Sequence, residues 1–225
     1  MAKLARHTTE KAELILDVAR DIIRETGEFD LPMRTLAARA QVSMRTPYEL
    51  FGSKGGLVSA ILMADQRAFK EVSANIASTD SLDNIFDRVQ FGTEFYAREE
   101  PFYRALFRAT GGYPDSRHEP TQDNLRSFQI LTSRAVRDGF LDPAVNVALI
   151  GETLSHLFAS NLRRWALGTE DIRRVNFHIG YGFAAVLGSV ALGEARERMA
   201  ARRRLYAEAL ERDGAVGPVK LREAG

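Results

Sequence analysis

Residues 34–54 read RTLAARAQVSMRTPYELFGSK, and this stretch decides the fold that the sequence predicts. Apolar residues recur at helical spacing on both sides of Gln41-Val42, so we expect two short helices joined by a tight turn. Ser43 is a preferred N-cap residue, and its hydroxyl is expected to accept a hydrogen bond from a backbone N–H of the second helix. A short polar helix that begins sharply and is held from behind is typical of proteins that enter the major groove of DNA.

Nearly every other segment also has the periodicity of a helix, and no run alternates apolar and polar residues long enough to predict a strand. Capping residues, glycine and proline mark the ends of the expected helices. The first four helices are expected from Thr9 to Gly27, from about Pro32 to Ala40, from Ser43 to Phe51, and from Lys54 to about Ile76. A fifth helix is capped by Asp80 or Ser81, a sixth follows Pro101, and a loop from Gly111 to Pro120 leads to a seventh helix that ends at Gly139. The last three helices are expected from Asp142-Pro143 to about Leu167, from about Asp171 to Leu192, and from about Glu194 to Asp213.

These elements predict an all-α protein with two parts. Residues 1–53 are expected to form a three-helix DNA-binding domain, with a helix–turn–helix at 32–51. Residues 54–213 are expected to form a helical regulatory and dimerisation domain, followed by a flexible tail at 214–225. Because the three-helix unit is too small for a large core, the long helix that begins at Lys54 must support it from behind.

The charge of the chain is clustered rather than large overall. The chain has 225 residues with a formal net charge of only +1, so any DNA contact must come from a local group of cations. Residues 34–54 supply such a group, because Arg34, Arg39, Arg45 and Lys54 stand against Glu49 alone, for a local charge of +3.

Several classes of protein are excluded by composition. The chain has no cysteine, which excludes disulfides, thiolate zinc sites and cysteine nucleophiles. The charged N-terminal residues leave no apolar core for a signal peptide, and the longest apolar run, 181–193, is too short to span a bilayer. We expect a soluble cytoplasmic protein with no membrane partner, metal ion or cofactor.

The front of the third helix carries the candidate DNA contacts. Arg45 can bond a guanine edge with two N–H groups, which discriminates against a wrong base by about 1–3 kcal/mol. Thr46 can donate to a phosphate or touch a thymine methyl group, whereas Met44 can make only apolar contact. Tyr48 and Lys54 are placed to bond phosphates, which fixes register without reading sequence. The alternative is plain packing between helices, with Tyr48 in the core.

The stretch VSMRTPYELFGSKGGLVSAIL at 42–62, preceded by VARDIIRETG at 18–27 and MRTLAARAQ at 33–41, resembles the TetR family of bacterial transcription regulators. The resemblance is specific over about residues 15–62, and beyond them it extends only to the helical layout. It implies that the family's recognition residues are here Ser43, Met44, Arg45, Thr46 and Tyr48, with Lys54 as the phosphate-binding lysine. One departure is Pro32, which stands where the family usually has a serine or threonine cap.

An aromatic group in the second part predicts an apolar ligand pocket with a few polar tips. An ordinary packed core is the alternative for each member of the group. His156 lies four residues after Glu152, on the same face of the eighth helix, and it is a candidate polar anchor, as is His178. The residues assigned to the pocket are Phe91, Phe95, Tyr96, Phe102, Tyr103, Phe107, Phe128, His156, Phe158 and Trp165.

A dimer is expected because a single helix–turn–helix unit contacts too few bases for a specific site. The eighth and ninth helices are the candidate interface, and the family resemblance implies the same pairing. The ninth helix mixes apolar residues with small ones that permit close helix contact, although these residues could instead complete the core of a monomer. They are Ile179, Gly180, Gly182, Phe183, Ala184, Val186, Leu187, Gly188, Ser189 and Val190.

The sequence therefore predicts a ligand-responsive transcriptional regulator with double-stranded DNA as its partner. We expect a repressor that a small apolar or amphipathic molecule releases from a palindromic operator. Two alternatives remain. A buried Glu152–His156 pair could perform acid–base chemistry in an enzyme, or the chain could be a helical ligand-binding or scaffold protein that does not bind DNA.

Overall fold

The computed structural model describes residues 2–27, 31–73, 76, 78–109 and 119–212. Within these residues the chain forms ten helices and no strand, which confirms the all-α prediction. The helices are α1 Ala2–Thr26, α2 Met33–Arg39, α3 Arg45–Phe51, α4 Lys54–Ser73, α5 Ser81–Ala97, α6 Glu100–Ala109, α7 Glu119–Arg137, α8 Val147–Ala166, α9 Ile172–Val190 and α10 Gly193–Arg212.

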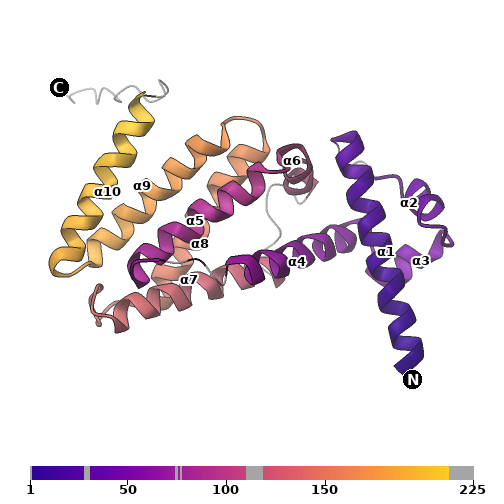
Figure 1. Cartoon of the computed structure of the whole chain (residues 1–225), viewed down its shortest axis with the longest axis horizontal. Coiled ribbons are helices and arrows are strands. Elements are labelled where there is room, and N and C mark those ends of the chain that lie inside the picture. Colours follow the sequence, from indigo (N-terminus) through magenta and orange to yellow (C-terminus); the bar gives the residue numbers. More distant parts are fainter. Residues whose placement is uncertain (1, 28–30, 74–75, 77, 110–118, 213–225) are drawn as a thin grey trace, which may run out of the picture.

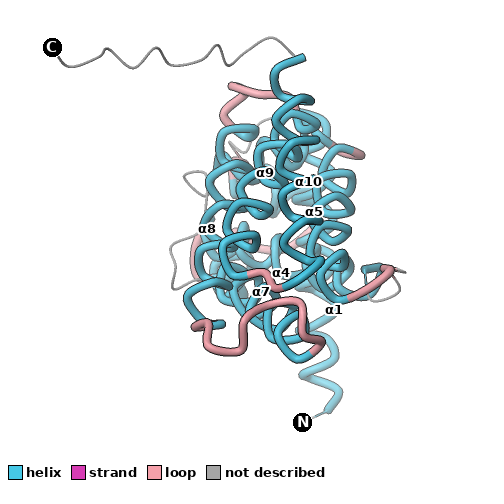
Figure 2. The backbone as a smooth tube through the Cα atoms, turned by 90° about the vertical axis from the view of Figure 1, so that its left-hand side faces the viewer, coloured by secondary structure: helices cyan, strands magenta, loops and turns pink. Residues whose placement is uncertain are grey.

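The molecule is elongated, with α1, α2 and α3 at one end and α10 at the other (Figure 1). We call the α1–α3 unit the head and α5–α10 the body. Helix α4 runs between them, from beside the head to the middle of the body (Figure 1). The view along the long axis shows the body helices gathered into one bundle (Figure 2). None of the described helices has the length and apolar character needed to cross a membrane.

The head has a small core that depends on α4. Ile15, Ala19 and Ile23 of α1 are fully buried, as are Leu36 of α2 and Leu57 of α4. Burying a large aliphatic side chain stabilises the fold by about 1.5–3 kcal/mol. Because the core of the head is small, the buried residues of α4 contribute a substantial share of its stability. The expectation that α4 supports the head from behind is therefore consistent with the packing.

The junction between α3 and α4 is a tight turn with a side-chain cap. Gly52 has a φ of +72°, in the left-handed region that glycine adopts without steric cost. The Ser53 hydroxyl accepts a hydrogen bond from the Gly56 N–H at 3.0 Å, and the Ser53 carbonyl accepts from the Leu57 N–H at 3.0 Å. Ser53 therefore caps α4.

Several expected helix boundaries are wrong. Helix α1 begins at Ala2, so Thr9 lies inside it rather than before it. Helix α4 ends at Ser73 instead of about Ile76. Helix α8 begins at Val147 with Asn146 as its cap, not at Asp142-Pro143. The predicted loop at 111–120 falls mostly outside the described residues, but its last two residues belong to α7, and the predicted tail also lies outside them.

The late start of α8 has a physical cause in the backbone before it. The Asp142 N–H donates to the Val190 carbonyl at 2.9 Å, and the Leu192 N–H donates to the Phe140 carbonyl at 3.0 Å. These bonds accompany an antiparallel bridge between Leu141 and Ala191, which holds the backbone extended where a helix was expected. The Asp142 side chain accepts instead from the Ala144 N–H, in a turn that precedes α8.

Helix α10 is attached to the body by an acidic cluster at the start of α5. Asp83 accepts from Arg198 and Arg202 of α10, each at 2.7 Å, and the Arg202 guanidinium lies 4.5 Å from the Phe86 ring centroid. Burial acts to raise the pKa of Asp83, but the hydrogen bonds from the two arginines outweigh it and leave this pKa lowered. The charged carboxylate is therefore favoured in the folded protein.

Asp83→Asn is expected to lower the free energy of unfolding by about 1–2 kcal/mol at neutral pH, because two charge-assisted hydrogen bonds are weakened. A carboxyl whose pKa is lowered by folding stabilises the protein above its unfolded pKa and loses this contribution as the pH falls through its folded pKa. Urea unfolding at pH 7 and pH 3 should show the difference between parent and variant shrinking at the lower pH, with the exposed Asp138→Asn as control. A difference of the same size at both pH values would contradict this assignment.

Candidate nucleic-acid interface

Helix α3 begins one residue later than the sequence predicts. Its N-cap is Met44, which makes no side-chain capping bond, so the prediction that the Ser43 hydroxyl caps the backbone is wrong. The Ser43 carbonyl accepts from the Thr46 N–H at 3.0 Å, and the Ser43 and Thr46 hydroxyls lie 2.8 Å apart in a hydrogen bond. Met44 already has helical backbone angles, so the chain enters α3 through a tight turn rather than through an extended cap residue.

The turn between α2 and α3 fixes how α3 is presented. Gln41 has a φ of +53°, in the left-handed region that costs a side-chain-bearing residue about 1–2 kcal/mol. The Val42 N–H donates to the Ala37 carbonyl at 2.9 Å, and the Gln41 N–H donates to the Ala38 carbonyl at 3.2 Å. These bonds close the end of α2 and direct the chain sharply into α3.

One face of α3 is packed and the other is open to solvent. Pro47 is buried, and Val42, Leu50 and Phe51 pack half-buried against the core. The Arg45 side chain is 85% exposed, and Tyr48 is 46% exposed, so the alternative that places Tyr48 in the core is wrong.

The other candidate DNA contacts also reach the surface. Ser43 and Met44 are exposed beside Arg45, and Thr46 is half-buried. Arg34 is exposed on the first turn of α2, and Lys54 is half-buried at the start of α4. The structure therefore places five of the seven candidates at residues 43–48, around the start of α3, and the remaining two on the elements before and after it.

Arg39 and Arg45, which belong to the cations counted in this stretch, are engaged with carboxylates. Arg39 makes a two-pronged pair with Glu25 of α1, at 2.6 and 2.8 Å, and its hydrogen bonds lower the pKa of Glu25. The Arg45 Nε lies 2.6 Å from the Glu49 carboxylate, one turn along α3. The sequence count of +3 already subtracts Glu49, so it is the pairing of Arg39 with Glu25 that makes the positive charge available on this surface smaller than that count. A DNA phosphate or base would have to compete with Glu49 for Arg45.

The predicted aromatic residues are brought together in two groups of contacting rings, one around Tyr96 and one around Phe128. Tyr96 lies 5.0 Å from Tyr103 and 5.2 Å from Phe107 between ring centroids, both edge-on. Phe102, Tyr103, Phe107, Phe128, Phe158 and Trp165 are buried, and Phe91, Phe95 and Tyr96 are half-buried. The Trp165 indole N–H is buried with no hydrogen-bond partner among the described residues.

Two aromatic members were missed, and one predicted member lies elsewhere. Phe69 of α4 lies 5.4 Å from Phe91, and Phe183 of α9 lies 5.3 Å from Phe128. Both stand on the inward stripe of a predicted helix, which is the signal that could have identified them. His156 is exposed on α8, so the structure does not bring it into either group of rings.

Two grooves open on other faces of the body, and none of the predicted pocket residues lines either. One lies between α5 and α9, and the other between α9 and α10. The first is lined by Gln90, Thr93, Glu94, Ala97, Ile172, Arg173, Asn176 and Phe177, and the second by Ala184, Ala185, Gly188, Ser189, Arg196, Met199, Ala200 and Arg203.

The interpretation of Glu152 and His156 as a buried acid–base pair is wrong, because both residues are exposed. His178 is half-buried on α9, with its Nε2 3.5 Å from the Glu170 carboxylate. Burial lowers the pKa of His178 and outweighs the opposing effect of Glu170. The surroundings of His178 are those of a histidine packed in the body.

The small residues of α9 serve packing within the chain. A Cβ at Gly180 would collide with the Tyr206 ring of α10, and one at Gly182 would lie 3.2 Å from Leu157 of α8. Ile179, Phe183 and Leu187 of the same helix are fully buried. On α8 and α9, the apolar residues that remain exposed include Leu149 of α8, 58% exposed, and Tyr181 of α9, 41% exposed.

No family model matches the sequence, and a comparison with curated proteins gives no match. Solved structures do match. A TetR-family transcriptional regulator from Pectobacterium atrosepticum is 21% identical with a TM-score of 0.66, and the match covers 84% of this chain and 97% of that chain. The transcriptional repressor QsdR from R. erythropolis, of the TetR family, is 20% identical with a TM-score of 0.59, over 82% and 97% of the two chains.

A gamma-butyrolactone receptor described as ArpA-like is 20% identical with a TM-score of 0.53, and the match covers 92% of this chain and all of that chain. The chain therefore has the fold of TetR-family regulators, with a helix–turn–helix head and a helical body. Two of these three neighbours are described as transcriptional regulators and the third as a receptor.

Proposed function

We propose that the chain is a TetR-family transcriptional regulator, a sequence-specific DNA-binding protein that acts as a ligand-responsive repressor. One observation carries this proposal: the start of α3 is exposed at the far end of the molecule, on a helix whose opposite face is packed. A rigid helix presented in this way fits the major groove, where base edges carry a distinct pattern of donors and acceptors. The likeness in fold to known regulators supports the same conclusion.

In the proposed complex, Arg45 reads a base and its neighbours position the head. The guanidinium leaves Glu49 and bonds a guanine through two N–H groups, while Thr46 and Met44 contact adjacent bases. Ser43, Tyr48, Arg34 and Lys54 bond the phosphates on either side. Glu49 remains near the interface as a negative charge. On DNA where Arg45 finds no matching base, Glu49 repels the phosphates and so opposes non-specific binding.

The proposed regulator works as a dimer through α8 and α9, since a palindromic operator needs two heads. Leu149 and Tyr181 leave apolar surface on these two helices that a second copy would cover. Helix α10 already covers part of α9, so the interface uses the outer face of α8 and the exposed edge of α9. The effector would bind in the body and alter the relative placement of the two heads.

Leu149→Glu is expected to shift the chain toward a monomer, because it places a charge at a site that the partner copy would bury. Sedimentation analysis should show a dimer for the parent and a monomer, or at least a hundredfold weaker dimer, for the variant. Ile130→Glu changes an exposed apolar residue of α7 and should leave the dimer intact. Equal self-association of parent and Leu149→Glu would exclude this face.

Selection of bound duplexes from a random-sequence pool tests the proposed function. We expect enrichment of an inverted repeat whose half-sites are about one helical turn, or a multiple of it, apart. Binding to the enriched duplex should weaken steeply with salt, since phosphate contacts release counterions. Failure to enrich any sequence, with folded dimeric protein, would refute the proposal.

A further inference from the structure

The groove between α5 and α9 carries one charge on each wall. Glu94 lines it from α5 and Arg173 lines it from α9, and both residues are exposed. Within the part of the chain that the structure describes, no ion pair joins these two side chains, and neither pairs with another opposite charge. Because the two charges border the same groove without meeting, both are open to a molecule that lies between them.

Hydrogen-bonding groups accompany the two charges. The Gln90 side-chain amide donates to the Glu94 carboxylate at 2.9 Å, which holds that carboxylate against its wall. A carboxylate accepts up to about four hydrogen bonds, so Glu94 keeps room for further donors. Asn176, half-buried on α9, lines the same groove, and its side-chain amide makes no hydrogen bond to any described residue. The groove therefore presents acceptors on the α5 side, and donors from Arg173 and Asn176 on the α9 side.

Between these polar groups the groove is apolar and small. Ile172 is buried and Phe177 is half-buried, and both line the groove from α9, together with Ala97 of α5. The hydroxyl of Thr93, another lining residue, already donates to the Gln90 carbonyl at 2.9 Å. The groove has a volume of about 190 Å³, below the roughly 300–1,000 Å³ of pockets that take drug-sized ligands. It therefore fits a small metabolite with one short apolar group.

The two opposite charges decide the class of that metabolite. A simple anion would be repelled by Glu94, and a simple cation would be repelled by Arg173. A wholly apolar molecule would take both charges out of water without replacing their hydrogen bonds, which costs free energy. A molecule that carries an ammonium group, a carboxylate and a short apolar chain satisfies both walls and the surface between them. Free amino acids with apolar side chains have this set of groups.

We propose that the α5–α9 groove binds a free α-amino acid with an apolar side chain. In this complex the Arg173 guanidinium bonds the ligand carboxylate through two N–H groups, and the Asn176 amide donates to the same carboxylate. The Glu94 carboxylate accepts from the ligand ammonium group. The ligand side chain lies against Ile172 and Phe177, where it removes apolar surface from water.

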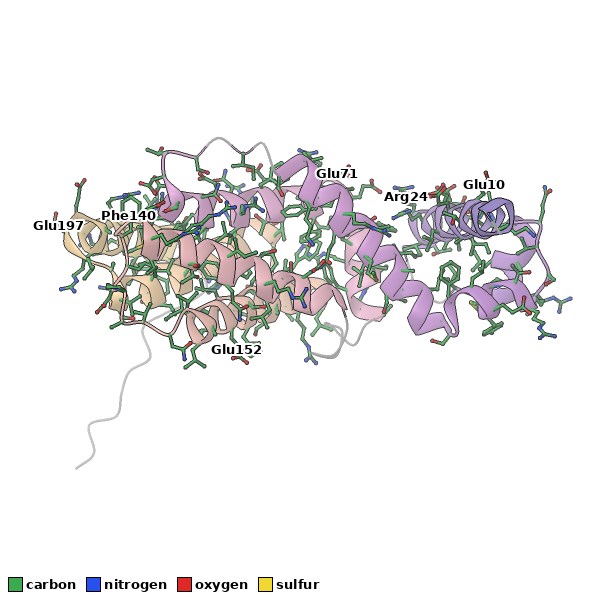
Figure 3. All side chains as sticks on the ribbon, turned by 90° about the horizontal axis from the view of Figure 1, so that it is seen from below. Glu10, Arg24, Glu71, Phe140, Glu152 and Glu197 are labelled. Atoms are coloured by element: carbon green, nitrogen blue, oxygen red, sulfur yellow. The ribbon has the colours of Figure 1, made fainter. Side chains whose placement is uncertain are left out.

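The groove lies on a different side of α9 from α8. The Phe177 ring centroid is 6.4 Å from that of Tyr206 of α10, whereas a Cβ at Gly182 would lie 3.2 Å from Leu157 of α8. The outer face of α8, from which Glu152 points away from the body (Figure 3), belongs to the face proposed for the dimer. A dimer of that kind leaves the groove open. Amino-acid binding also needs no DNA, so a failed selection of duplexes would leave the test of this groove unaffected.

Saturation-transfer NMR on the full chain tests the ligand class with L-leucine and L-phenylalanine. Exposed charges are screened by water, so we expect dissociation constants of about 1 mM. Two matched ligands keep the apolar chain of leucine but only one of its charges, namely 3-methylbutylamine and 4-methylpentanoate. Each should bind at least about tenfold more weakly than L-leucine. No transfer to either amino acid, or equal binding of L-leucine and its two analogues, would overturn the proposal.

Charge variants locate the site and separate a direct contact from a structural effect. Glu94→Gln and Arg173→Gln are each expected to weaken L-leucine binding at least about tenfold. Glu94→Gln should bind 4-methylpentanoate as the parent does, because this ligand has no ammonium group, and Arg173→Gln should likewise keep its binding of 3-methylbutylamine. A merely structural role would weaken all three ligands alike. Glu208→Gln on α10 and Arg126→Gln on α7 change exposed charges outside the groove and should bind L-leucine as the parent does.

A steric variant tests the groove without changing its charge. Ala97 is exposed, so Ala97→Phe fills the groove at little risk to the fold, and it should abolish saturation transfer to L-leucine. Thermal unfolding of the variant without ligand should match that of the parent. L-leucine binding that persists unchanged in Ala97→Phe and in both charge variants would place the ligand elsewhere and overturn the proposal.

Discussion

Replacing Arg45 with alanine is expected to lower the affinity for the enriched duplex by about a hundredfold or more. A two-pronged arginine–guanine contact provides about 1–3 kcal/mol of discrimination, and a palindromic site contains two such contacts. The 85% exposure of the Arg45 side chain means that its removal leaves no cavity, so the fold should be unaffected. Fluorescence anisotropy with the enriched duplex, and with duplexes altered at each half-site position, measures both affinity and base preference.

Two further variants show whether the affinity lost in Arg45→Ala comes from a missing base contact. Lys54→Ala is expected to weaken binding to all duplexes alike and to reduce the salt dependence, because it removes a phosphate contact. Arg126→Ala, at an exposed arginine of α7, should bind like the parent. An Arg45→Ala protein that keeps both the affinity and the base preference of the parent would show that Arg45 does not read the operator.

Gly56→Ala is expected to remove DNA binding by distorting the head. A Cβ at residue 56 would overlap the carbonyl oxygen of Phe51, which is backbone and cannot rotate away. The α3–α4 junction must therefore shift, at a cost of about 3 kcal/mol in the free energy of unfolding, as for other overpacked sites. Hydrogen exchange should accelerate in the head while the body helices α8 and α9 keep their protection.

The neighbouring glycine provides a matched control. A Cβ at Gly55 would lie 3.6 Å from the Ser53 hydroxyl oxygen, an ordinary van der Waals contact. Gly55→Ala is therefore expected to leave DNA binding intact and to stabilise the protein by up to about 0.5–1 kcal/mol, since alanine is the better helix former. If the two variants behave alike, the close approach at residue 56 does not control the head.

The helical architecture could be predicted because its signals are local. Glycine in a left-handed turn and a serine cap follow from the residues themselves, and the structure has both at Gly52 and Ser53. The start of α8 could not be predicted, because the bonds from Asp142 and Leu192 join segments about fifty residues apart. Likewise, Thr9 is a good cap by type but lies inside α1, where the helix continues to Ala2.

The exposure of the candidate site residues could be anticipated from the sequence, but their ion-pair partners could not. The exposure of Arg45 and Tyr48 agrees with the sequence pattern. The pairing of Arg39 with Glu25 could not be anticipated, because it requires α1 and α2 to be placed relative to each other. For the same reason, the aromatic residues could be grouped by periodicity, but which rings pack together depends on contacts between helices α4 to α9.

Site-specific crosslinking at Tyr48 tests the central claim most directly. The photoreactive residue p-benzoylphenylalanine would replace Tyr48 at the exposed face of α3, or the exposed Leu205 on α10 as a control that lies outside the proposed dimer interface. Illumination with the enriched duplex should crosslink the Tyr48 variant to DNA within each half-site and leave the Leu205 variant uncrosslinked. No crosslink at Tyr48, or equal crosslinking at both positions, would contradict the account that α3 is the DNA-reading helix.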